Sequence, residues 1–444
     1  MKISSILAIL ISTLFITSCK EEPTKPSTET NLTIEILDKS CTEVWIDIKA
    51  NDQAAKLGSV YLNDEFKTQF YLKDTVVYLD ELLPNETYTI KLTNQDGIGT
   101  QTEFTTMDTT SHNFTWETFE FGGEGGSSYL RDVAIINEND IWAVGEIFIE
   151  DTYTYDSNGV WQHPYNAVHW DGNKWELKRI FVDYRGQPNF APLEGVFALP
   201  DGKIIFSSGL PYLPEGDHWK LYHLWDMGIL DENDRSVTSI WGTSLNNLYF
   251  VGRKGTIVHY NGSSWSKIES GTTIDLISLT PGEGNEIFVS GYDDSNGSSI
   301  LLKIKEGISE IIWQKEGLEE KEPYNGLIYG MWSNSNNLFL STSNKTSTLF
   351  RQRISDLKDI KRLEGKLLWR INSMDGKASN DIVTLGDRFE ISHYNGSRIQ
   401  SIYRENISSI GFGIKIKENI IISVGTIVRT NNIFNDAYVV IGRR

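Results

Sequence analysis

The stretch GRKGTIVHYNGSSW (252–265) decides the fold, because its second half recurs along the chain. VHYNGSSW (258–265) is echoed by VHWDGNKW (168–175) and by SHYNGSRI (392–399). Each copy has a His, an aromatic residue, an Asn or Asp and a Gly in the same order. Asn-Gly and Asp-Gly between apolar runs are typical of tight β-hairpin turns. The recurrence therefore predicts one repeated supersecondary unit.

Alignment on this His position gives seven copies with a period of about 45 residues. The aligned column reads His169, His223, His259, Lys303, Arg351, His393 and Val440. Each copy has two strand-like runs before the column, such as LRDVAII and NDIWAVG, and several have a further run after it, such as KWELKRI. We therefore predict a seven-bladed β-propeller over residues 113–444. A single large sandwich, the alternative, would not explain seven sequential repeats.

The last copy reaches Arg444 before its outer strand, and NFTWETFEF (113–121) precedes the first copy without a place of its own. We predict that this segment supplies the missing strand of the last blade and closes the ring. Such closure would leave few exposed strand edges.

Residues 32–108 alternate apolar and polar positions in short runs separated by turns, which predicts an antiparallel sandwich. Within them, LLPNETYTI (82–90) resembles the turn into the sixth strand of a fibronectin type III domain, and the resemblance implies that Tyr88 is the tyrosine-corner residue. The stretch 252–265 resembles the repeat of BNR, or sialidase-like, propellers, although the Asp-box form Ser-x-Asp-x-Gly-x-x-Trp is absent. The whole order resembles a family of bacterial surface lipoproteins, which implies a fold and a location without an activity.

The first residues, MKISSILAILISTLFITSC, carry one Lys, an apolar run and then small residues, which predicts a secretion signal over 1–18. Ile16 to Cys19 resemble the lipobox of bacterial lipoproteins, and this implies that Cys19 becomes a lipid-bearing N-terminus; the alternative is an ordinary cleaved signal. The following KEE resembles a surface-export tag, or is a solvated charge run. Residues 19–31 read as a flexible tether. We expect an outer membrane lipoprotein at the cell surface, held to the membrane only by its lipid.

Composition and motifs exclude several classes of function. With 41 basic and 60 acidic residues the net charge is −19, which disfavours nucleic acid as a partner. No G-x-S-x-G, H-E-x-x-H, P-loop or Asp-x-Asp occurs, and we expect no cofactor.

The recurring His residues would fan out around the ring axis, so we expect no metal site. Each should instead end a third strand and bond to nearby backbone. Trp175 and Trp265 should pack between blades, and Cys41 should be a buried thiol without a disulfide.

Three long insertions depart from the repeat, at 146–166, 181–194 and 210–220. Loops between second and third strands and links between blades open on the same face of a propeller, so we predict one wall over the first two blades. The wall is rich in aromatic, acidic and basic side chains, and the candidate binding residues on it are Tyr155, Asp156, Trp161, His163, Tyr165, Tyr184, Arg185, Tyr212, His218 and Trp219. Aromatic faces beside carboxylates suit a neutral glycan, and they equally suit a protein partner. A third interpretation is that these aromatics only pack the loops against the propeller.

We therefore expect a non-enzymatic binding or scaffold lipoprotein that recognises a glycan or an envelope protein through this rim. The alternative is a glycan-active enzyme, a hydrolase or lyase, on the same face. An enzyme needs two carboxylates, or an acid with a His or Tyr, that converge in a pocket. A binding protein needs only an open aromatic platform.

Overall fold

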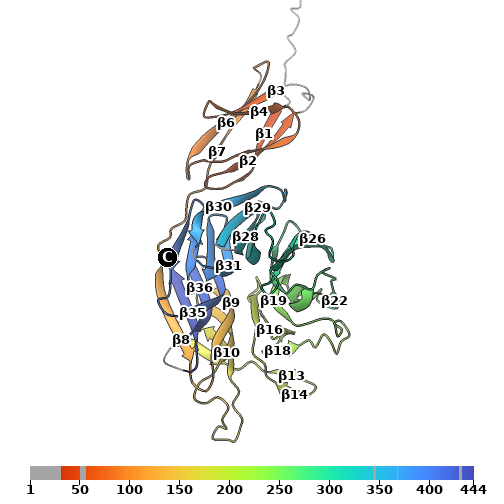
Figure 1. The fold of residues 1–444 in the computed structure, drawn as a ribbon, viewed down its shortest axis with the longest axis vertical. Helices are drawn as coiled ribbons and strands as arrows, with labels where there is room; N and C mark the ends of the chain where they lie inside the picture. The colour runs from red at the N-terminus through yellow and green to blue at the C-terminus, as the bar shows by residue number, and fades with distance from the viewer. Residues whose placement is uncertain (1–31, 51–56, 98, 344–346, 368, 430–432) are drawn as a thin grey trace, which may run out of the picture. The chain divides into compact units, whose positions relative to one another are not determined.

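The computed structural model describes residues 32–444 except 51–56, 98, 344–346, 368 and 430–432 (Figure 1). The predicted signal segment 1–18, Cys19 and the tether 19–31 lie outside the described residues. Regular structure in the described part consists of β-strands and one 3-10 turn, Arg253–Gly255, so the predicted all-β class is confirmed. No helix that could cross a membrane occurs in this part of the chain.

The described residues form two compact units. The first contains residues 32–37, 45–77 and 88–104; the second contains 38–44, 78–87 and 105–444. Alternating burial along the strands of the first unit, as in β3, shows that one face of each sheet is covered. Trp45, on the second strand, is buried in its core. The strands of this unit form a sheet β1-β2-β5 and a sheet β4-β3-β6-β7, with β1 (Leu32–Lys39), β2 (Val44–Ala50), β3 (Leu57–Leu62), β4 (Glu65–Tyr71), β5 (Thr75–Leu79), β6 (Thr87–Asn94) and β7 (Gly99–Thr105).

The second unit contains seven four-stranded sheets within the described residues, and we number them as blades 1 to 7. Blades 1 to 3 are β9 (Tyr129–Asn137), β10 (Asp140–Ile147), β11 (Tyr165–Trp170) and β12 (Trp175–Lys178); β15 (Gly195–Ala198), β16 (Ile204–Ser207), β17 (Pro211–Glu215) and β18 (His218–Leu221); and β19 (Val237–Ser244), β20 (Asn247–Gly252), β21 (Ile257–Tyr260) and β22 (Trp265–Lys267). Blades 4 and 5 are β23 (Leu276–Pro281), β24 (Ile287–Asp293), β25 (Ser298–Lys305) and β26 (Ile308–Lys315); and β27 (Leu327–Ser333), β28 (Asn337–Ser343), β29 (Ser347–Arg353) and β30 (Ile360–Leu367). Blades 6 and 7 are β31 (Ile371–Ala378), β32 (Asp381–Gly386), β33 (Ile391–Tyr394) and β34 (Ile399–Tyr403); and β35 (Ser409–Lys417), β36 (Ile420–Ile427), β37 (Asp436–Arg443) and β8 (Thr115–Gly122).

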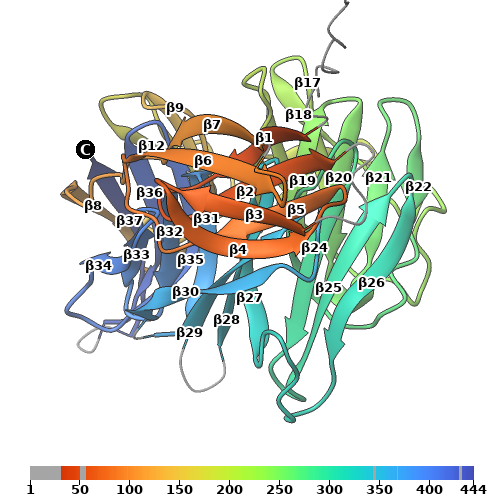
Figure 2. The ribbon, with the colours of Figure 1, turned by 90° about the horizontal axis from the view of Figure 1, so that it is seen from above.

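The first strand of each blade lies next to the first strand of the following blade. These contacts run from β9 through β15, β19, β23, β27 and β31 to β35, and β35 in turn contacts β9. Figure 2 shows the blades following one another around a centre in chain order. The apolar clusters lie between neighbouring blades; one of them, for example, joins Val133 and Ala143 of blade 1 to Val424 and Val439 of blade 7. Each blade is therefore covered on both faces, which explains the almost continuous apolar runs in strands such as β36.

The segment predicted to complete the last blade is β8, which begins at Thr115 and pairs antiparallel with β37. The register runs from Asp436↔Gly122 to Arg443↔Thr115. Phe119 and Phe121 on β8 pack against the cluster between blades 7 and 1. Residues from the two ends of the segment 105–444 therefore share one sheet.

The recurring Asn-Gly and Asp-Gly pairs form the turns between third and fourth strands, as predicted. In blade 3, Asn261 Oδ1 accepts the backbone N–H groups of Ser263 and Ser264 at 3.0 and 2.9 Å, and Gly262 has φ +91°. The corresponding residues of blades 1 and 6 make the same bonds: Asp171 accepts from Asn173 and Lys174, and Asn395 accepts from Ser397 and Arg398. A side-chain acceptor followed by a left-handed Gly is therefore the local reason for the repeat.

The His residues before these turns bond to side chains, and the predicted backbone partner is wrong. His169 Nε2 lies 2.9 Å from Asp140 Oδ1, and His259 Nε2 lies 2.9 Å from Asn247 Oδ1. The acceptor in each case is the first residue of the second strand, one hairpin away. Each ring also stacks on an aromatic ring of that strand, His169 on Trp142 at 4.3 Å and His259 on Tyr249 at 4.2 Å. The His residues therefore fasten third strands to second strands.

Packing of Trp175 and Trp265 between blades is also as predicted. Trp175 contacts Phe119 of blade 7 and Trp170 of its own blade. Trp265 is 6% exposed, and it packs against Tyr222, which follows blade 2.

The alignment of the second repeat is wrong. LYHLWD (221–226) was expected to be its third strand, with 210–220 as an inserted loop, but the third and fourth strands are β17 and β18. Tyr212 lies opposite Leu221 and Glu215 opposite His218, with Gly216 in the left-handed region at the turn. Residues 210–220 are thus the regular outer hairpin of blade 2, and His223 belongs to the link that follows it.

Candidate binding site on the link face

Two of the three predicted insertions lie on one face of the ring. Because the strands of a blade alternate in direction, second-to-third-strand loops and blade-to-blade links emerge together, and we name that side the link face. The loop between β10 and β11 and the link between blades 1 and 2 both emerge there. The β17–β18 turn, a connection from third to fourth strand, emerges on the opposite face.

The β10–β11 loop presents an exposed aromatic cluster. Tyr155 pairs with Trp161 as an isolated bridge, their rings lie 5.0 Å apart, and they remain 69% and 41% exposed. Tyr153, 50% exposed, lies 6.0 Å from the Trp161 ring. Asp156 holds the tip of the loop, since its Oδ1 accepts the N–H groups of Asn158 and Val160 at 2.9 Å each. Asp156 is thus a turn residue, while Tyr155 and Trp161 face solvent.

An arginine that the sequence did not single out anchors this loop. Arg179 Nη2 lies 3.0 and 3.1 Å from the two carboxylate oxygens of Asp151, and Arg179 Nε donates to the carbonyl of His163 at 2.7 Å. Its guanidinium lies 3.8 Å from the ring centroid of Tyr165, whose hydroxyl donates to Asp151 at 3.1 Å. Tyr165 therefore belongs to the anchor and not to the exposed surface. No local sequence pattern marks Arg179, because its partners His163 and Asp151 lie 16 and 28 residues before it in the chain.

The link between blades 1 and 2 folds into a small hairpin, β13 (Val182–Tyr184) and β14 (Gln187–Asn189). It touches the β10–β11 loop through His163, which stacks on Phe190 at 4.9 Å and meets Phe181 edge-on at 5.6 Å. These contacts make the loop and the link one surface, as predicted.

The hairpin also contacts the link between blades 2 and 3, which takes the place of the third predicted insertion. Tyr184 stacks on His223 at 4.8 Å, and both the Tyr184 hydroxyl and Arg185 Nη2 reach Asp226 Oδ2, at 3.1 and 2.8 Å. Hydrogen bonds from Arg185 and Tyr184 lower the pKa of the Asp226 carboxyl, and this side chain stays ionised beside them. His223 and Asp226 are members of the wall that the incorrect repeat alignment concealed.

The remaining three predicted residues are not on the wall. Tyr212 is buried, and burial raises the pKa of its hydroxyl, which accepts a hydrogen bond from Ser208 Oγ at 2.7 Å. Trp219 packs on Phe206 at 4.8 Å and donates through Nε1 to the Ile204 carbonyl at 2.9 Å. His218 is exposed in the β17–β18 turn, on the opposite face. The positions of these three residues follow from the assignment of 210–220 to the outer hairpin of blade 2.

The first strands of all seven blades line a central cavity of about 550 Å³. Two of its carboxylates bind the backbone of the next blade: Asp132 accepts the Val196 N–H at 3.0 Å, and Asp375 accepts the Ile416 N–H at 2.9 Å. Burial raises the pKa of both carboxyls. Asp375 raises the pKa of Lys415, whose Nζ lies 3.8 Å from its Oδ1. These groups therefore join blades, and Lys415 interacts electrostatically with both carboxylates.

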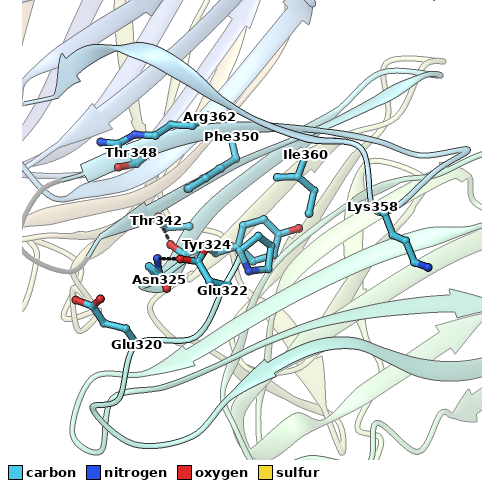
Figure 3. Close-up of a pocket in the computed structure, with 11 residues that line it drawn as sticks. Glu320, Glu322, Tyr324, Asn325, Thr342, Thr348, Phe350, Lys358, Ile360 and Arg362 are labelled. Atoms are coloured by element: carbon cyan, nitrogen blue, oxygen red, sulfur yellow. Dashed lines mark hydrogen bonds between the residues drawn. The ribbon is translucent and has the colours of Figure 1, made fainter. Parts of the chain in front are cut away.

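A second hollow, of about 640 Å³, lies beside blade 5 (Figure 3). Glu322 Oε1 accepts Asn325 Nδ2 at 2.6 Å, and Tyr324, whose hydroxyl pKa is raised by burial, donates to Gln352 at 2.6 Å. Figure 3 shows Glu320 set apart from Glu322, so that the two carboxylates do not converge. Among the described residues, no group of three or more His, Cys, Asp or Glu side chains is placed to hold a metal ion.

Solved structures show the class of fold. "YCF48 bound to D1 peptide" superposes with a TM-score of 0.50 at 11% identity, covering 74% of this chain and 95% of that chain. YCF48 from Cyanidioschyzon merolae gives 0.49 at 10% identity over 74% and 98%, and the Dos1 propeller gives 0.46 at 7% over 74% and 95%. No family model and no curated protein matches the sequence. The chain is thus an all-β protein whose structural neighbours are β-propellers, and at these identities the likeness shows the fold alone.

Proposed function

We propose that the protein is a non-enzymatic binding protein that recognises a protein partner or a glycan through the link face of blades 1 and 2. The observation that carries this proposal is the exposed Tyr153, Tyr155 and Trp161 cluster on a loop that Arg179 fixes in place. Exposed, immobilised aromatic rings lose little conformational entropy on binding and act as anchors of interfaces. Propeller neighbours agree with a protein-binding or scaffold role; one of them carries a bound peptide in its title.

A glycan-active enzyme is the alternative, and it finds less support. Among the described residues the wall offers Asp156, which is used in its own turn, and Asp226, which is paired with Arg185. Asp226 has Tyr184 and His223 beside it, but its carboxylate is bonded to Arg185 and to the Tyr184 hydroxyl, and Asp156 is bonded to backbone N–H groups. Neither carboxylate is thus left uncommitted for general acid and base chemistry. Product detection in the binding experiment below tests this alternative directly.

We further propose a location and an N-terminal role. Cys19 carries the lipid of an outer membrane lipoprotein exposed at the cell surface, and the first unit is a fibronectin type III-like spacer. Its two sheets of three and four strands, together with Tyr88 stacked on Phe104 at 5.6 Å, support the latter assignment. The pairing of β8 with β37 supports a propeller whose ring is held shut at this blade. Cys19→Ser should move the protein from the membrane fraction to the soluble fraction; unchanged attachment contradicts the lipid anchor.

The binding proposal is tested with the full-length protein, purified in detergent and carrying a photoreactive phenylalanine analogue at Val160, which is 56% exposed beside the aromatic cluster. The protein is applied to a glycan array and, separately, cross-linked in intact cells, with mass spectrometry identifying what is joined to position 160. The glycan arm also includes analysis of released products. A ligand found in either arm is then titrated against variants.

Trp161→Ala should weaken binding of that ligand by about 30-fold, since an interface anchor contributes about 2 kcal/mol. The matched control is Tyr71→Ala, which removes an aromatic ring that is 65% exposed in the first unit. Equal effects of the two variants would contradict a site on this face. Release of a cleaved glycan would replace the binding role with the enzymatic one.

A further inference from the structure

A tryptophan flanked by two arginines lies on the link face at blades 6 and 7, away from the aromatic cluster of blade 1. The guanidinium of Arg388 lies 4.6 Å from the ring centroid of Trp369, and that of Arg404 lies 5.5 Å from it. The three residues come from three connections: the link from blade 5 to blade 6, the β32–β33 loop, and the link from blade 6 to blade 7. Both arginines are exposed. We name this set the Arg–Trp–Arg site.

The β32–β33 loop is held in a strained conformation that positions Arg388. Arg388 and Phe389 have φ of +57° and +51°, in the left-handed region that residues other than glycine and asparagine seldom adopt. Phe389 is fully buried, and the Arg388 N–H donates to the Ser409 carbonyl at 3.1 Å. On the other side, the Glu405 N–H donates to the Arg388 carbonyl at 3.3 Å. Strain of this kind is maintained by surrounding contacts and concentrates at functional sites.

The site has donors without acceptors. Within the described part of the chain, neither guanidinium has a hydrogen bond or an ion pair, and the buried Trp369 Nε1 has no acceptor. The nearby acids are engaged elsewhere: Asp387 accepts from Asn372, and Glu405 accepts the hydroxyls of two tyrosines. A protein of net charge −19 thus leaves the side chains of two arginines without an ion pair at one place. Guanidinium edges in this state are suited to carboxylates or other oxyanions.

The surroundings of the site are apolar, which bears on the kind of anion. Ile407 and Ile410, in the chain that follows Arg404, are 41% and 38% exposed. A ligand that covers this surface needs carboxylates for the arginines and apolar groups for the isoleucines, a combination that polypeptides supply and that polysaccharides and free phosphate do not.

We propose that the Arg–Trp–Arg site binds an acidic, partly apolar segment of the protein partner. This inference rests on the proposed binding function and specifies its partner as a protein with such a segment. The carboxylates of the segment bond to Arg388 and Arg404 across the Trp369 ring, and its apolar side chains cover Ile407 and Ile410.

The test uses the full-length protein and fluorescence anisotropy with a labelled peptide of about twelve residues that combines Glu and Leu. Its Gln–Leu counterpart, polyglutamate, polygalacturonate and inorganic phosphate serve as competing or comparison ligands. We expect the Glu–Leu peptide to bind, the Gln–Leu peptide to bind at least about tenfold more weakly, and added salt to weaken the binding. The double variant Arg388→Gln/Arg404→Gln should lower the affinity for the Glu–Leu peptide at least about tenfold.

The matched control is Arg253→Gln, which removes one positive charge from an exposed position on the same face without a stacked ring. Equal binding of the Glu–Leu and Gln–Leu peptides, or an equal loss in the control, overturns the proposal. Binding of polygalacturonate or phosphate as tight as that of the peptide also overturns it. Trp161→Ala should leave peptide affinity unchanged; if that variant loses the cross-linked partner while the Glu–Leu peptide fails to bind, the proposed function stands and this inference falls.

Discussion

Acid should weaken the packing of the segment that precedes β8, because a histidine there is held in its neutral form. His112 Nδ1 and His393 Nδ1 lie 2.8 Å apart, and His393 Nε2 lies 3.1 Å from Asp381 Oδ1. Since the carboxylate must accept, His393 carries a proton on Nε2, and in the neutral pair its Nδ1 accepts from His112 Nδ1. His112 Nε2 is then a buried atom without a partner in the described structure. A second proton on His112 would have no acceptor there.

The environment accordingly disfavours the charged form of His112. Burial, the neighbouring His393 and the charges of Arg398 and Arg444 lower the pKa of His112 to about 4 from its ordinary 6.5. The unfolded chain therefore takes up a proton at His112 at a higher pH than the folded chain does. Stability is complete above pH 6.5, and it decreases as the pH falls from 6.5 towards 4.

The magnitude follows from the two pKa values. At pH 5 the difference in proton uptake between the folded and unfolded chains lowers the free energy of unfolding by about 2 kcal/mol. Well below pH 4 this loss reaches its limit of about 3.4 kcal/mol. The His112 ring is half-buried, so solvent screens part of this effect. We expect about 1 kcal/mol of stability to be lost between pH 7.5 and pH 5 through this residue.

The assay is urea unfolding of the wild type and of His112→Gln at pH 7.5 and pH 5. The glutamine amide can donate to His393 Nδ1 in place of the imidazole, and it does not titrate. All other titrating groups are shared, so the difference between the two proteins isolates His112. The wild type should lose about 1 kcal/mol more than the variant on acidification. Identical pH dependence of the two proteins would refute the assignment of the buried, unpartnered Nε2.

Three further predictions concern other elements. Deleting 113–121 should lower the thermal midpoint of the propeller markedly, because β8 pairs along its whole length with β37 and packs Phe119 against the cluster between blades 7 and 1; Glu117→Gln, which breaks only an exposed ion pair, should change stability by less than about 1 kcal/mol. Arg179→Met should make limited proteolysis within the β10–β11 loop about tenfold faster, because charge-assisted bonds of about 1.5 kcal/mol or more are lost; unchanged cleavage would show that the loop is held otherwise. Cys41 should resist iodoacetamide at pH 8 until the protein is denatured, since burial raises its pKa to about 12, and rapid alkylation in the folded state would contradict that burial.

The blade register could be predicted from sequence because it depends on local chemistry. In blades 1, 3 and 6 the Asx residue and the left-handed Gly of the 3–4 turn are adjacent in sequence, and their bonds do not depend on the rest of the fold. The second repeat was misaligned for the same reason: it lacks an Asn-Gly or Asp-Gly at this turn, and HLW (223–225) resembles the His column. Its turn is marked instead by Gly216, between the strand-like runs YLPE and HWKL.

The candidate site was less predictable because its contacts join distant segments. Loop length located the wall, but it could not distinguish exposed Trp161 from Tyr165, which Arg179 holds from 14 residues away. The Arg–Trp–Arg site has no sequence signature at all. Its members lie in three separate connections, and only the ring brings them together.

The two surfaces have different physical characters, and this constrains how one partner could use both. The blade 1 cluster is aromatic, whereas the Arg–Trp–Arg site is positively charged. Blade 7 contacts both blade 6 and blade 1 through its inner strand β35, which also lines the central cavity. A protein that docks on the aromatic cluster could therefore extend an acidic segment across this strand to the Arg–Trp–Arg site. Docking at the cluster would raise the effective concentration of that segment at the second site, so the two contacts together would bind more tightly than either alone. Under the two proposals, a partner must offer both an apolar anchor and an acidic segment, and this paired requirement is more selective than either alone, since either group alone occurs on many proteins.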